Sequence, residues 1–410
     1  MNKRKTINQS GQKEHNLGAI IRELHTDRSC TRVKLAEAMQ LTQASITKII
    51  DQLIEWGVVS ERGGVGSGVG RRAIRLHLNT ENYHVVAARI SRGWMVAAVY
   101  DMDGRLCDMI RREFDADERP VDAVNNLANM IRTLILRSKV RILSIGVAVP
   151  GPYDYYAGKI SLISGFPGWD EINVREQLQS AFDIPVFIDQ DANCGALAEM
   201  WYTEGNRDTN MVFVVAERGV GAGLLLNSSI YRGSSGFAGE FGHASINIFG
   251  PICECGNRGC LELYGSLVAL ENLYQQESFD PAHPGTALVR VSAKEILVRV
   301  HAGEALAVRV FSKTVAYLCF GVVGIINTLN PETVVFADRM VSGSEELFLE
   351  IADQTFKQFL LPEIYSRLRV KACTLDGDPM LLGASVLAFD QMLQTPSAFF
   401  HTEENAELEG

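Results

Sequence analysis

One histidine and three cysteines stand close together in the segment HASINIFGPICECGNRGCLE, residues 243–262. His243 precedes a C-x-C-x4-C pattern formed by Cys253, Cys255 and Cys260. One imidazole nitrogen and three thiolates are donors that zinc prefers, and four protein ligands leave no open position for water. Glycines in the segment let a short loop fold tightly enough for the donors to converge. The pattern therefore predicts a structural Zn2+ site, with a group of reduced surface thiols as the alternative.

Two carboxylates flank these predicted zinc ligands. Glu240 lies three residues before His243, and Glu262 lies two residues after Cys260. A metal-bound loop would fix the direction of both side chains. Carboxylates and an imidazole held together in a cleft suit the hydroxyls of a sugar, which can donate and accept hydrogen bonds at once. Taken singly, each acid could equally be an ordinary surface residue.

The composition indicates a globular protein of two or three domains, with 410 residues of which 47% are hydrophobic. No apolar run reaches the roughly 18 residues of a membrane span, and the first residues lack the apolar region of a secretory signal. We therefore expect a cytoplasmic protein without membrane insertion, in a compartment where disulfides are rare. The five cysteines outside the cluster are expected to be small buried hydrophobic residues: Cys30, Cys107, Cys194, Cys319 and Cys373.

The net charge is distributed unevenly along the chain. Residues 1–80 carry 13 Lys and Arg against 7 Asp and Glu, a net charge of +6, whereas the whole chain has −10. The remaining 330 residues therefore carry −16. A basic N-terminal part on an acidic body indicates a nucleic-acid-binding module joined to a part that does not bind nucleic acid.

Three short amphipathic helices are predicted before Gly57. Thr31 and Thr42 are expected to be the N-caps of the second and third helices, which a tight turn joins into a helix-turn-helix. The third helix is expected to bury one apolar face, consisting of Ile46, Ile49, Ile50, Leu53 and Ile54.

The start of the third helix and the segment after it carry groups that could contact DNA. Short polar side chains on its open face can reach base edges or phosphates in the major groove: Thr42, Gln43, Ala44, Ser45, Thr47 and Lys48. Two β-prone runs then flank a glycine-rich tip, with Arg71, Arg72 and Arg75 on the return side. This pattern predicts a winged helix-turn-helix over residues 1–80 that binds double-stranded DNA. The alternative is a three-helix packing module with a surface loop.

The rest of the chain alternates β and α patterns, which indicates an α/β body with mixed sheets. Five stretches in order carry a family resemblance: GVAVPGPYD, FIDQDANCGALAE, GVGAGLLLNSSIYRGSSGFAGEFGH, CECGNRGCLE and NTLNPETVVF. From about residue 83 the body resembles the ROK family (repressors, open reading frames and sugar kinases). With the winged helix in front, the chain resembles the branch that contains the NagC, Mlc and XylR repressors.

The resemblance implies a fold, an assembly and a sugar site. The body would be two-lobed and actin-like, of the ribonuclease-H-like type, with a smaller α/β lobe at 81–198 completed by a C-terminal helix at 380–395. The larger lobe, 199–379, would hold the zinc loop and an oligomerisation surface for a homodimer or homotetramer. The residues implied to contact an effector sugar are Asp191, Glu240, His243 and Glu262.

The phosphate-binding elements of ROK kinases are altered in this sequence. Where the kinases carry a D-x-G-G-T loop, this chain has Arg89, Ser91, Arg92 and Gly93, and the adenosine loop reads Ala337-Asp338-Arg339. Only the GVGAG segment is intact. Asp191 would then be the relic of a kinase base, with no catalytic residue left. Arg89 and Arg92 are interpreted as solvent-exposed structural arginines, with contact to a phosphate group of the ligand as the alternative.

These observations predict a transcriptional regulator and not an enzyme. We expect a repressor of carbohydrate uptake or catabolism genes that binds an inverted-repeat operator and responds to a sugar or sugar-phosphate effector. Gly165 and Gln190 replace residues common near the sugar in the kinases, which leaves the identity of the effector open. The first alternative is a ROK sugar kinase, and the second is a regulator controlled by a transporter or another protein partner.

Overall fold

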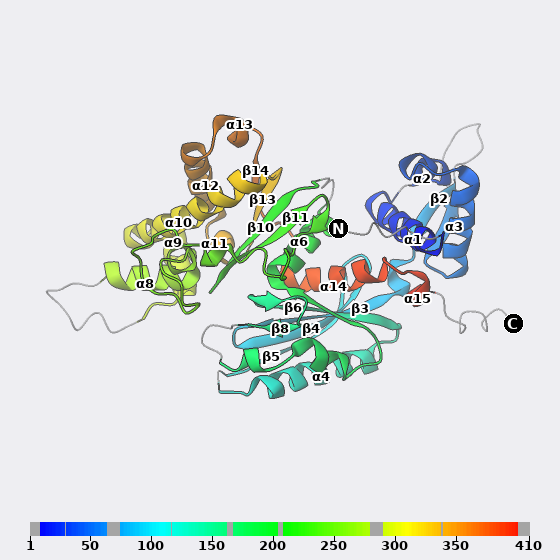
Figure 1. Cartoon of the computed structure of the whole chain (residues 1–410), viewed down its shortest axis with the longest axis horizontal. Coiled ribbons are helices and arrows are strands. Elements are labelled where there is room, and N and C mark those ends of the chain that lie inside the picture. Colours follow the sequence, from blue (N-terminus) through cyan, green and yellow to red (C-terminus); the bar gives the residue numbers. More distant parts are fainter. Residues whose placement is uncertain are drawn as a thin grey trace.

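The computed structural model describes residues 9–28, 30–63, 74–115, 117–161, 167–203, 208–278, 290–337 and 339–400. They form a small N-terminal unit and a larger body with two five-stranded sheets. Figure 1 shows the N-terminal unit at one side of the body, next to the C-terminal helices. The boundaries of 1–80, 81–198 and 199–379 for three domains stay a prediction.

Three helices and two strands make up the N-terminal unit: α1 (Gln9–Thr26), α2 (Arg32–Ala38), α3 (Gln43–Glu55), β1 (Val59–Gly63) and β2 (Ile74–Leu78). Thr31 accepts a hydrogen bond from the Lys34 amide (3.3 Å) and Thr42 from the Ser45 amide (3.2 Å), which confirms both predicted N-caps. β1 and β2 pair antiparallel. The tip between them, with Arg71 and Arg72, lies outside the described residues.

The buried residues of α3 match the predicted apolar face except at the C-terminal end of the helix. Ile46, Ile50 and Leu53 are fully buried, but Ile54 is 36% exposed, so its expected burial was wrong. Ile54 follows Leu53 by one position, which turns its side chain about 100° away from the buried stripe.

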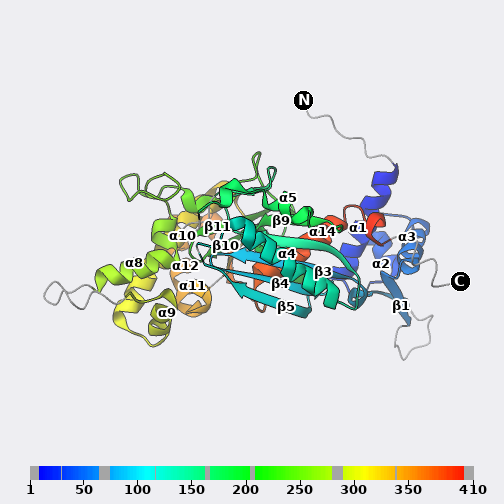
Figure 2. The same ribbon diagram turned by 90° about the horizontal axis from the view of Figure 1, so that it is seen from below.

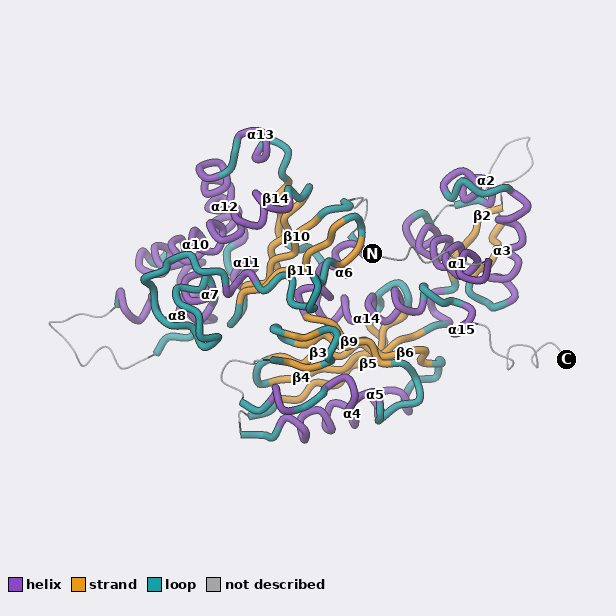
Figure 3. Tube along the Cα trace, in the orientation of Figure 1, coloured by secondary structure: helices purple, strands orange, loops and turns teal. Residues whose placement is uncertain are grey.

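The first sheet of the body is β3 (His84–Ser91), β4 (Trp94–Asp101), β5 (Leu106–Glu113), β6 (Ile142–Val149) and β9 (Val186–Gln190), in the order β5-β4-β3-β6-β9. All eight residues of β6 are buried, because helices cover both faces of the sheet. Figure 3 shows α4 (Pro120–Arg137) and α5 (Val174–Gln179) on one side of the strands and α14 (Pro379–Met392) on the other.

The second sheet is β10 (Met211–Ala216), β11 (Val220–Leu226), β12 (Ser229–Ile230), β13 (Thr333–Ala337) and β14 (Arg369–Ala372), in the order β12-β11-β10-β13-β14. The helices beside it are α7 (Glu262–Gly265), α8 (Leu267–Glu277), α9 (Ala293–His301), α10 (Ala305–Leu329), α11 (Arg339–Ser342), α12 (Glu345–Phe359) and α13 (Pro362–Tyr365). Among the described residues, only α10 has the length and hydropathy to cross a membrane, and half of its most apolar stretch is buried inside this half of the body. Figure 2 shows α10 among α8, α9 and α12.

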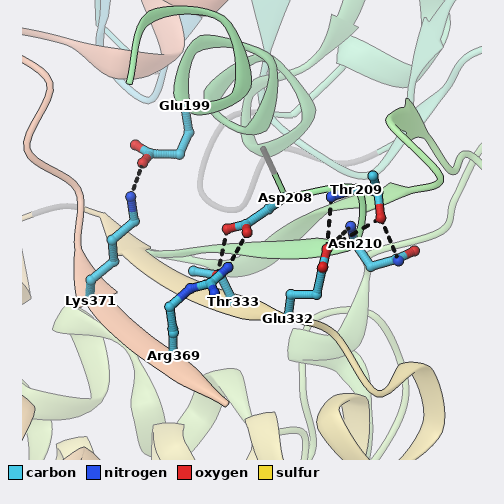
Figure 4. A network of polar contacts seen from close by, with 8 residues as sticks. All are labelled: Glu199, Asp208, Thr209, Asn210, Glu332, Thr333, Arg369 and Lys371. Carbon is cyan, nitrogen blue, oxygen red and sulfur yellow. Dashed lines mark hydrogen bonds and ion pairs between the residues drawn. The ribbon is translucent and has the colours of Figure 1, made fainter. Parts of the chain in front are cut away.

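The two sheets are joined through α6 (Asp191–Tyr202), which lies between them. At its C-terminal end, the fully buried Glu199 accepts a hydrogen bond of 2.5 Å from Lys371 on β14 (Figure 4). In the same figure Asp208 pairs with Arg369, and Glu332 accepts hydrogen bonds from the amides that precede β10. Since a buried carboxylate is costly unless it is paired, the contact of Glu199 fixes α6 against β14, while the more exposed Asp208 and Glu332 link the segment before β10 to β14 and β13.

The N-terminal unit packs on the end of α14. Its α1 residues Leu17, Ile20 and Ile21 share one core with Phe389 and Met392. A Cβ on Gly18 would lie far inside contact distance of the Leu393 carbonyl oxygen, so the close approach of the two helices needs glycine there. Arg22 also forms an ion pair of 2.9 Å with Asp390, and together these contacts attach the unit to the body.

His25, at the end of α1, makes the stability of this junction depend on pH. Its ring is 9% exposed and lies 4.8 Å from the ring of Trp201 on α6, and burial lowers its pKa to about 4. The unfolded chain therefore takes up a proton near pH 6.5, whereas the folded chain does so only near pH 4. The contribution of neutral His25 to stability is complete above pH 6.5 and is lost as the pH falls towards 4.

We predict that His25→Phe flattens the fall in unfolding midpoint between pH 6.5 and 4, because phenylalanine keeps the ring contact and takes up no proton. The measurement is urea unfolding followed by fluorescence across this range. His301→Phe, at the end of α9 in the far half of the body, is the control and keeps the wild-type acid dependence. An identical slope in His25→Phe and wild type would contradict the assignment.

Candidate ligand site and metal centre

A cavity of about 290 Å³ opens between the two halves of the body. All four residues expected to bind a sugar line it: Asp191, Glu240, His243 and Glu262. Asp191 comes from the start of α6, Glu240 and His243 come from the segment that follows β12, and Glu262 is the first residue of α7. The structure therefore brings together the set that the sequence singled out, from two regions about 50 residues apart.

Backbone and side-chain hydrogen bonds orient these acids. Asp191 follows β9 directly and accepts a hydrogen bond of 2.8 Å from the Ala192 amide. Gln190 donates to Glu240 Oε1 at 2.8 Å, so a residue of the first sheet holds a residue of the second half. Glu262 Oε2 accepts from the Val220 amide at 3.1 Å.

Burial raises the pKa of two acids in the cavity. It raises the pKa of Glu240 to about 8, with the charges of Asp191 and Glu262 as further causes, so this carboxyl is mostly protonated at pH 7. Burial also raises the pKa of Asp191, although Arg89 opposes that effect. A protonated Glu240 can donate a hydrogen bond while Glu262 accepts one, which matches the hydroxyls of a sugar.

Arg89 lies next to this cavity and was wrongly interpreted from the sequence as solvent-exposed. Only 3% of its side chain is exposed, because β3 is the central strand of its sheet. Its guanidinium lies 2.9 Å from Asp378, 3.7 Å from Asp191 and 3.8 Å from Glu217. Burial alone would lower its pKa, but these three carboxylates outweigh that effect and raise it.

Sequence reasoning missed Asp378 and Glu217. Asp378 is the N-cap of α14 and accepts hydrogen bonds of 3.1 Å from the amides of Met380 and Leu381. An Asp-Pro pair before an apolar helix is a recognisable helix start, so the cap could have been found from the sequence. Its partner Arg89 could not, because 289 residues separate them.

Four donor groups of the predicted metal site converge at the edge of the cavity. The ligand atoms of His243, Cys253, Cys255 and Cys260 all lie within 4.8 Å of one another. Cys253 Sγ is 3.8 Å from His243 Nδ1, and the sulfurs of Cys255 and Cys260 are 3.7 Å apart. Bonds of about 2.3 Å from a tetrahedral centre give an edge of about 3.8 Å, so the donor set fits a four-coordinate metal ion.

Backbone pairing holds the loop that carries these donors. Ser245 bridges to Cys260 and Ile252 to Arg258, and Gly259 has φ +67°, a conformation that favours glycine. His243 lines the cavity while its Nδ1 faces the sulfurs. The remaining cysteines vary in burial: Cys30, Cys194 and Cys319 are buried and Cys373 is half-buried, whereas Cys107 is exposed, contrary to expectation, because β5 is an edge strand.

Those residues expected to contact DNA that the structure describes are all exposed on the N-terminal unit. The side chains at the start of α3 are all exposed: Thr42, Gln43, Ala44, Ser45, Thr47 and Lys48. Arg75, on β2, is exposed as well. The buried face of α3 packs into its own unit, so this polar face is left towards solvent.

The chain is similar to transcriptional regulators and to a hexokinase. The model of the ROK family matches residues 87–391. The chain is 30% identical over 372 residues to the DNA-binding transcriptional dual regulator NagC of Escherichia coli, covering 87% of this chain and 89% of NagC. It is 26% identical over 383 residues to the xylose repressor of Bacillus subtilis, covering 93% and 96% of the two chains.

Solved structures share the fold. A ROK family transcriptional regulator described as a homolog of the E. coli MLC protein matches 94% of this chain and 97% of its own, with a TM-score of 0.78 at 24% identity. The ROK hexokinase from Thermus thermophilus matches 75% of this chain and 99% of its own, with a TM-score of 0.62 at 26% identity.

We predict that Arg89→Met lowers the free energy of unfolding by about 3–5 kcal/mol, because it leaves three carboxylates facing one another without a cation. The measurement is urea unfolding at pH 7. Adding Asp378→Asn to this variant should recover part of the loss. Arg119→Met, a surface arginine on the opposite side of the first sheet, is the control and keeps the wild-type midpoint. Equal midpoints for Arg89→Met and wild type would refute the role given to Arg89.

Proposed function

The chain belongs to the ROK family, and we propose that it is a DNA-binding transcriptional repressor controlled by a sugar or sugar phosphate. The observation that carries the proposal is the Arg89 cluster beside an otherwise complete sugar-type cavity. The relatives agree, since proteins named repressors align with 87–94% of this chain, whereas the hexokinase aligns with 75%.

The Arg89 cluster argues against phosphoryl transfer. A kinase needs a free carboxylate as general base and a cradle of amides for the phosphates. Here the carboxylate of Asp191 faces a buried guanidinium, and Arg89 on β3 takes space beside the cavity. These features favour a regulator over the alternative of a ROK sugar kinase, while Glu240, Glu262 and His243 keep their ability to bind hydroxyls.

The N-terminal unit would be a winged helix-turn-helix, which its three helices and the antiparallel pair of β1 and β2 support. The exposed polar start of α3 would enter the major groove, and the β1–β2 hairpin would contact the adjacent backbone. A homodimer or homotetramer would present such units to an inverted-repeat operator. The sugar would have a higher affinity for one arrangement of the two halves, and its binding would thereby release the operator. Coupling free energies between two such binding sites are typically about 1–3 kcal/mol.

The metal ion of the four-donor loop would be zinc with a structural role. Four protein ligands complete a tetrahedron, so the ion would hold the loop between Glu240 and Glu262 in shape and supply no reactive position. His243 would bind through Nδ1, which leaves its other ring nitrogen for a ligand hydroxyl.

We predict one zinc per chain in the purified protein, measured by inductively coupled plasma mass spectrometry. The double variant Cys253→Ser, Cys255→Ser should lose the zinc because it removes two of four ligands. Cys107→Ser, an exposed thiol outside the cluster, should keep it. Zinc retained by the double variant, or absent from the wild type, would contradict the assignment.

We predict that the protein binds operator DNA with strong salt dependence and forms no ADP from ATP with any hexose. An operator fragment can be selected from random DNA and its affinity measured by fluorescence anisotropy. Thr47→Ala combined with Lys48→Ala should weaken binding about ten-fold or more, because both side chains lie on the exposed face of α3. The control Lys159→Ala, in the first half of the body, should leave the affinity unchanged.

Three results separate the candidate functions. A repressor controlled by sugar loses operator affinity when a sugar or sugar phosphate is added. ADP formation would establish the kinase instead. If no small sugar shifts operator affinity but a purified transporter domain does, a protein partner controls the chain.

A further inference from the structure

A second cavity, of about 500 Å³, lies where the N-terminal unit meets the body. Its walls come from α1, α6, the segment around β12 and the end of α14, and it shares no lining residue with the first cavity. Helix α1 belongs to the N-terminal unit, and the other three elements belong to the body. A molecule in this junction cavity would therefore contact both parts of the protein at once.

The acidic side chains and arginines that line the junction cavity all have partners of opposite charge. Arg22 lies 2.9 Å from Asp390, and Arg232 lies 2.5 Å from Asp189. Asp208 pairs with an arginine of β14. Since these charges cancel in pairs, a charged ligand would have to displace an existing partner in order to be paired itself. The junction cavity therefore favours an uncharged ligand.

Uncharged polar groups without a partner line the same cavity. Ser228 and Ser229 come from the turn between β11 and β12 and the start of β12, while Gln391 and Gln394 come from the end of α14. Within the part of the chain that the structure describes, none of these four side chains forms a hydrogen bond. Hydroxyl and amide groups can both donate and accept, so the four groups can bind ligand hydroxyls.

Two lining residues also carry a buried nitrogen atom without a partner among the described residues. These atoms are Nε2 of His25 and Nε1 of Trp201, whose rings lie 4.8 Å apart. His25 is 9% exposed, and burial lowers its pKa to about 4, so its ring is neutral at pH 7. Buried polar groups in proteins nearly always have a partner, and a ligand with hydroxyls would bring partners to this wall of the cavity.

Apolar side chains form the rest of the wall that faces these polar groups. Leu197, Met200 and Trp201 lie on one face of α6, and Ile230 belongs to β12. Cavities that bind small molecules typically combine apolar walls with a few polar groups that fix the orientation of the ligand. A sugar ring has C–H groups on its faces and hydroxyls around its edge, so it matches apolar side chains bordered by hydroxyls and amides.

We propose that the junction cavity is a second ligand site, which binds an uncharged sugar of one or two rings. The two serines and the two glutamines bind its hydroxyls, while Trp201 packs against a face of the ring. Because α1 forms one wall and the body forms the others, the bound sugar holds the N-terminal unit against the body. Binding at this site does not depend on the proposed function, and only an effect on the operator rests on it.

The experiment is hydrogen exchange of backbone amides, followed by mass spectrometry on the full chain at pH 7. The ligands are xylose, glucose, N-acetylglucosamine, maltose and cellobiose, with glucose 6-phosphate as the charged comparison. We expect at least one neutral sugar to slow exchange in both segments 22–26 and 390–394. At a sugar concentration ten times its dissociation constant, the exchange that requires opening of the junction should slow about ten-fold. Glucose 6-phosphate should leave these two segments unchanged.

Substitutions assign this protection to the junction cavity. Gln391→Ala combined with Gln394→Ala should remove the protection of both segments and keep any protection of residues 240–262 beside the first cavity. Ser229→Trp, which fills the junction cavity without adding charge, should have the same effect. Gln354→Ala combined with Gln358→Ala, two exposed glutamines one turn apart on α12, is the control and should keep the wild-type protection.

The remaining outcomes separate this inference from the proposed function. Protection of residues 240–262 alone, or protection of the junction that persists in the Gln391→Ala, Gln394→Ala variant, would overturn the inference and leave a sugar-controlled repressor standing. Stronger protection of the junction by glucose 6-phosphate than by every neutral sugar would also overturn it. If a neutral sugar protects the junction but no sugar or sugar phosphate shifts operator affinity, the second site stands and the sugar-controlled function fails.

Discussion

A buried guanidinium beside three carboxylates is the interaction on which the body of this protein depends. Arg89 projects from the central strand β3, and its partners come from the start of α6, the end of β10 and the N-cap of α14. A cation cannot be buried without paired carboxylates, and these carboxylates cannot lie so close without a cation. The cluster therefore fixes where three distant segments meet, and the ligand cavity lies beside that meeting point.

The metal loop and the ligand cavity are formed by one continuous segment. Between Glu240 and Glu262 the chain supplies two cavity acids, a histidine that borders both sites and three cysteines. The loop has little regular structure of its own, being held by two isolated bridges and a short 3-10 turn. Short loops of this kind need cross-links to keep a single conformation, and a metal ion bound by four of its residues would provide one. Metal binding and ligand binding would then have a shared structural basis.

The sequence predicted the local features of the molecule and missed those that depend on distant contacts. The caps Thr31 and Thr42, the polar face of α3 and the donor set around His243 follow from spacing within a few residues, and the structure places them accordingly. The burial of Arg89 depends on a partner 289 residues away in the sequence, and no local sequence pattern predicts a contact at that separation. The exposure of Cys107 depends on strand order, because the pattern of β5 does not show that it would be an edge.

Helix α14 connects the cavity to the N-terminal unit. Its N-cap Asp378 holds Arg89, and its C-terminal end packs against Leu17 and Gly18 of α1 and pairs with Arg22 through Asp390. Fourteen residues of α-helix extend about 21 Å, so one rigid element spans the space between the two regions. Coupling between a ligand and bound DNA requires an element that both sites contact and whose position differs between two states. Because α14 is fixed by charge at one end and by close packing at the other, a change in the cavity that displaces Asp378 also displaces the surface on which α1 rests.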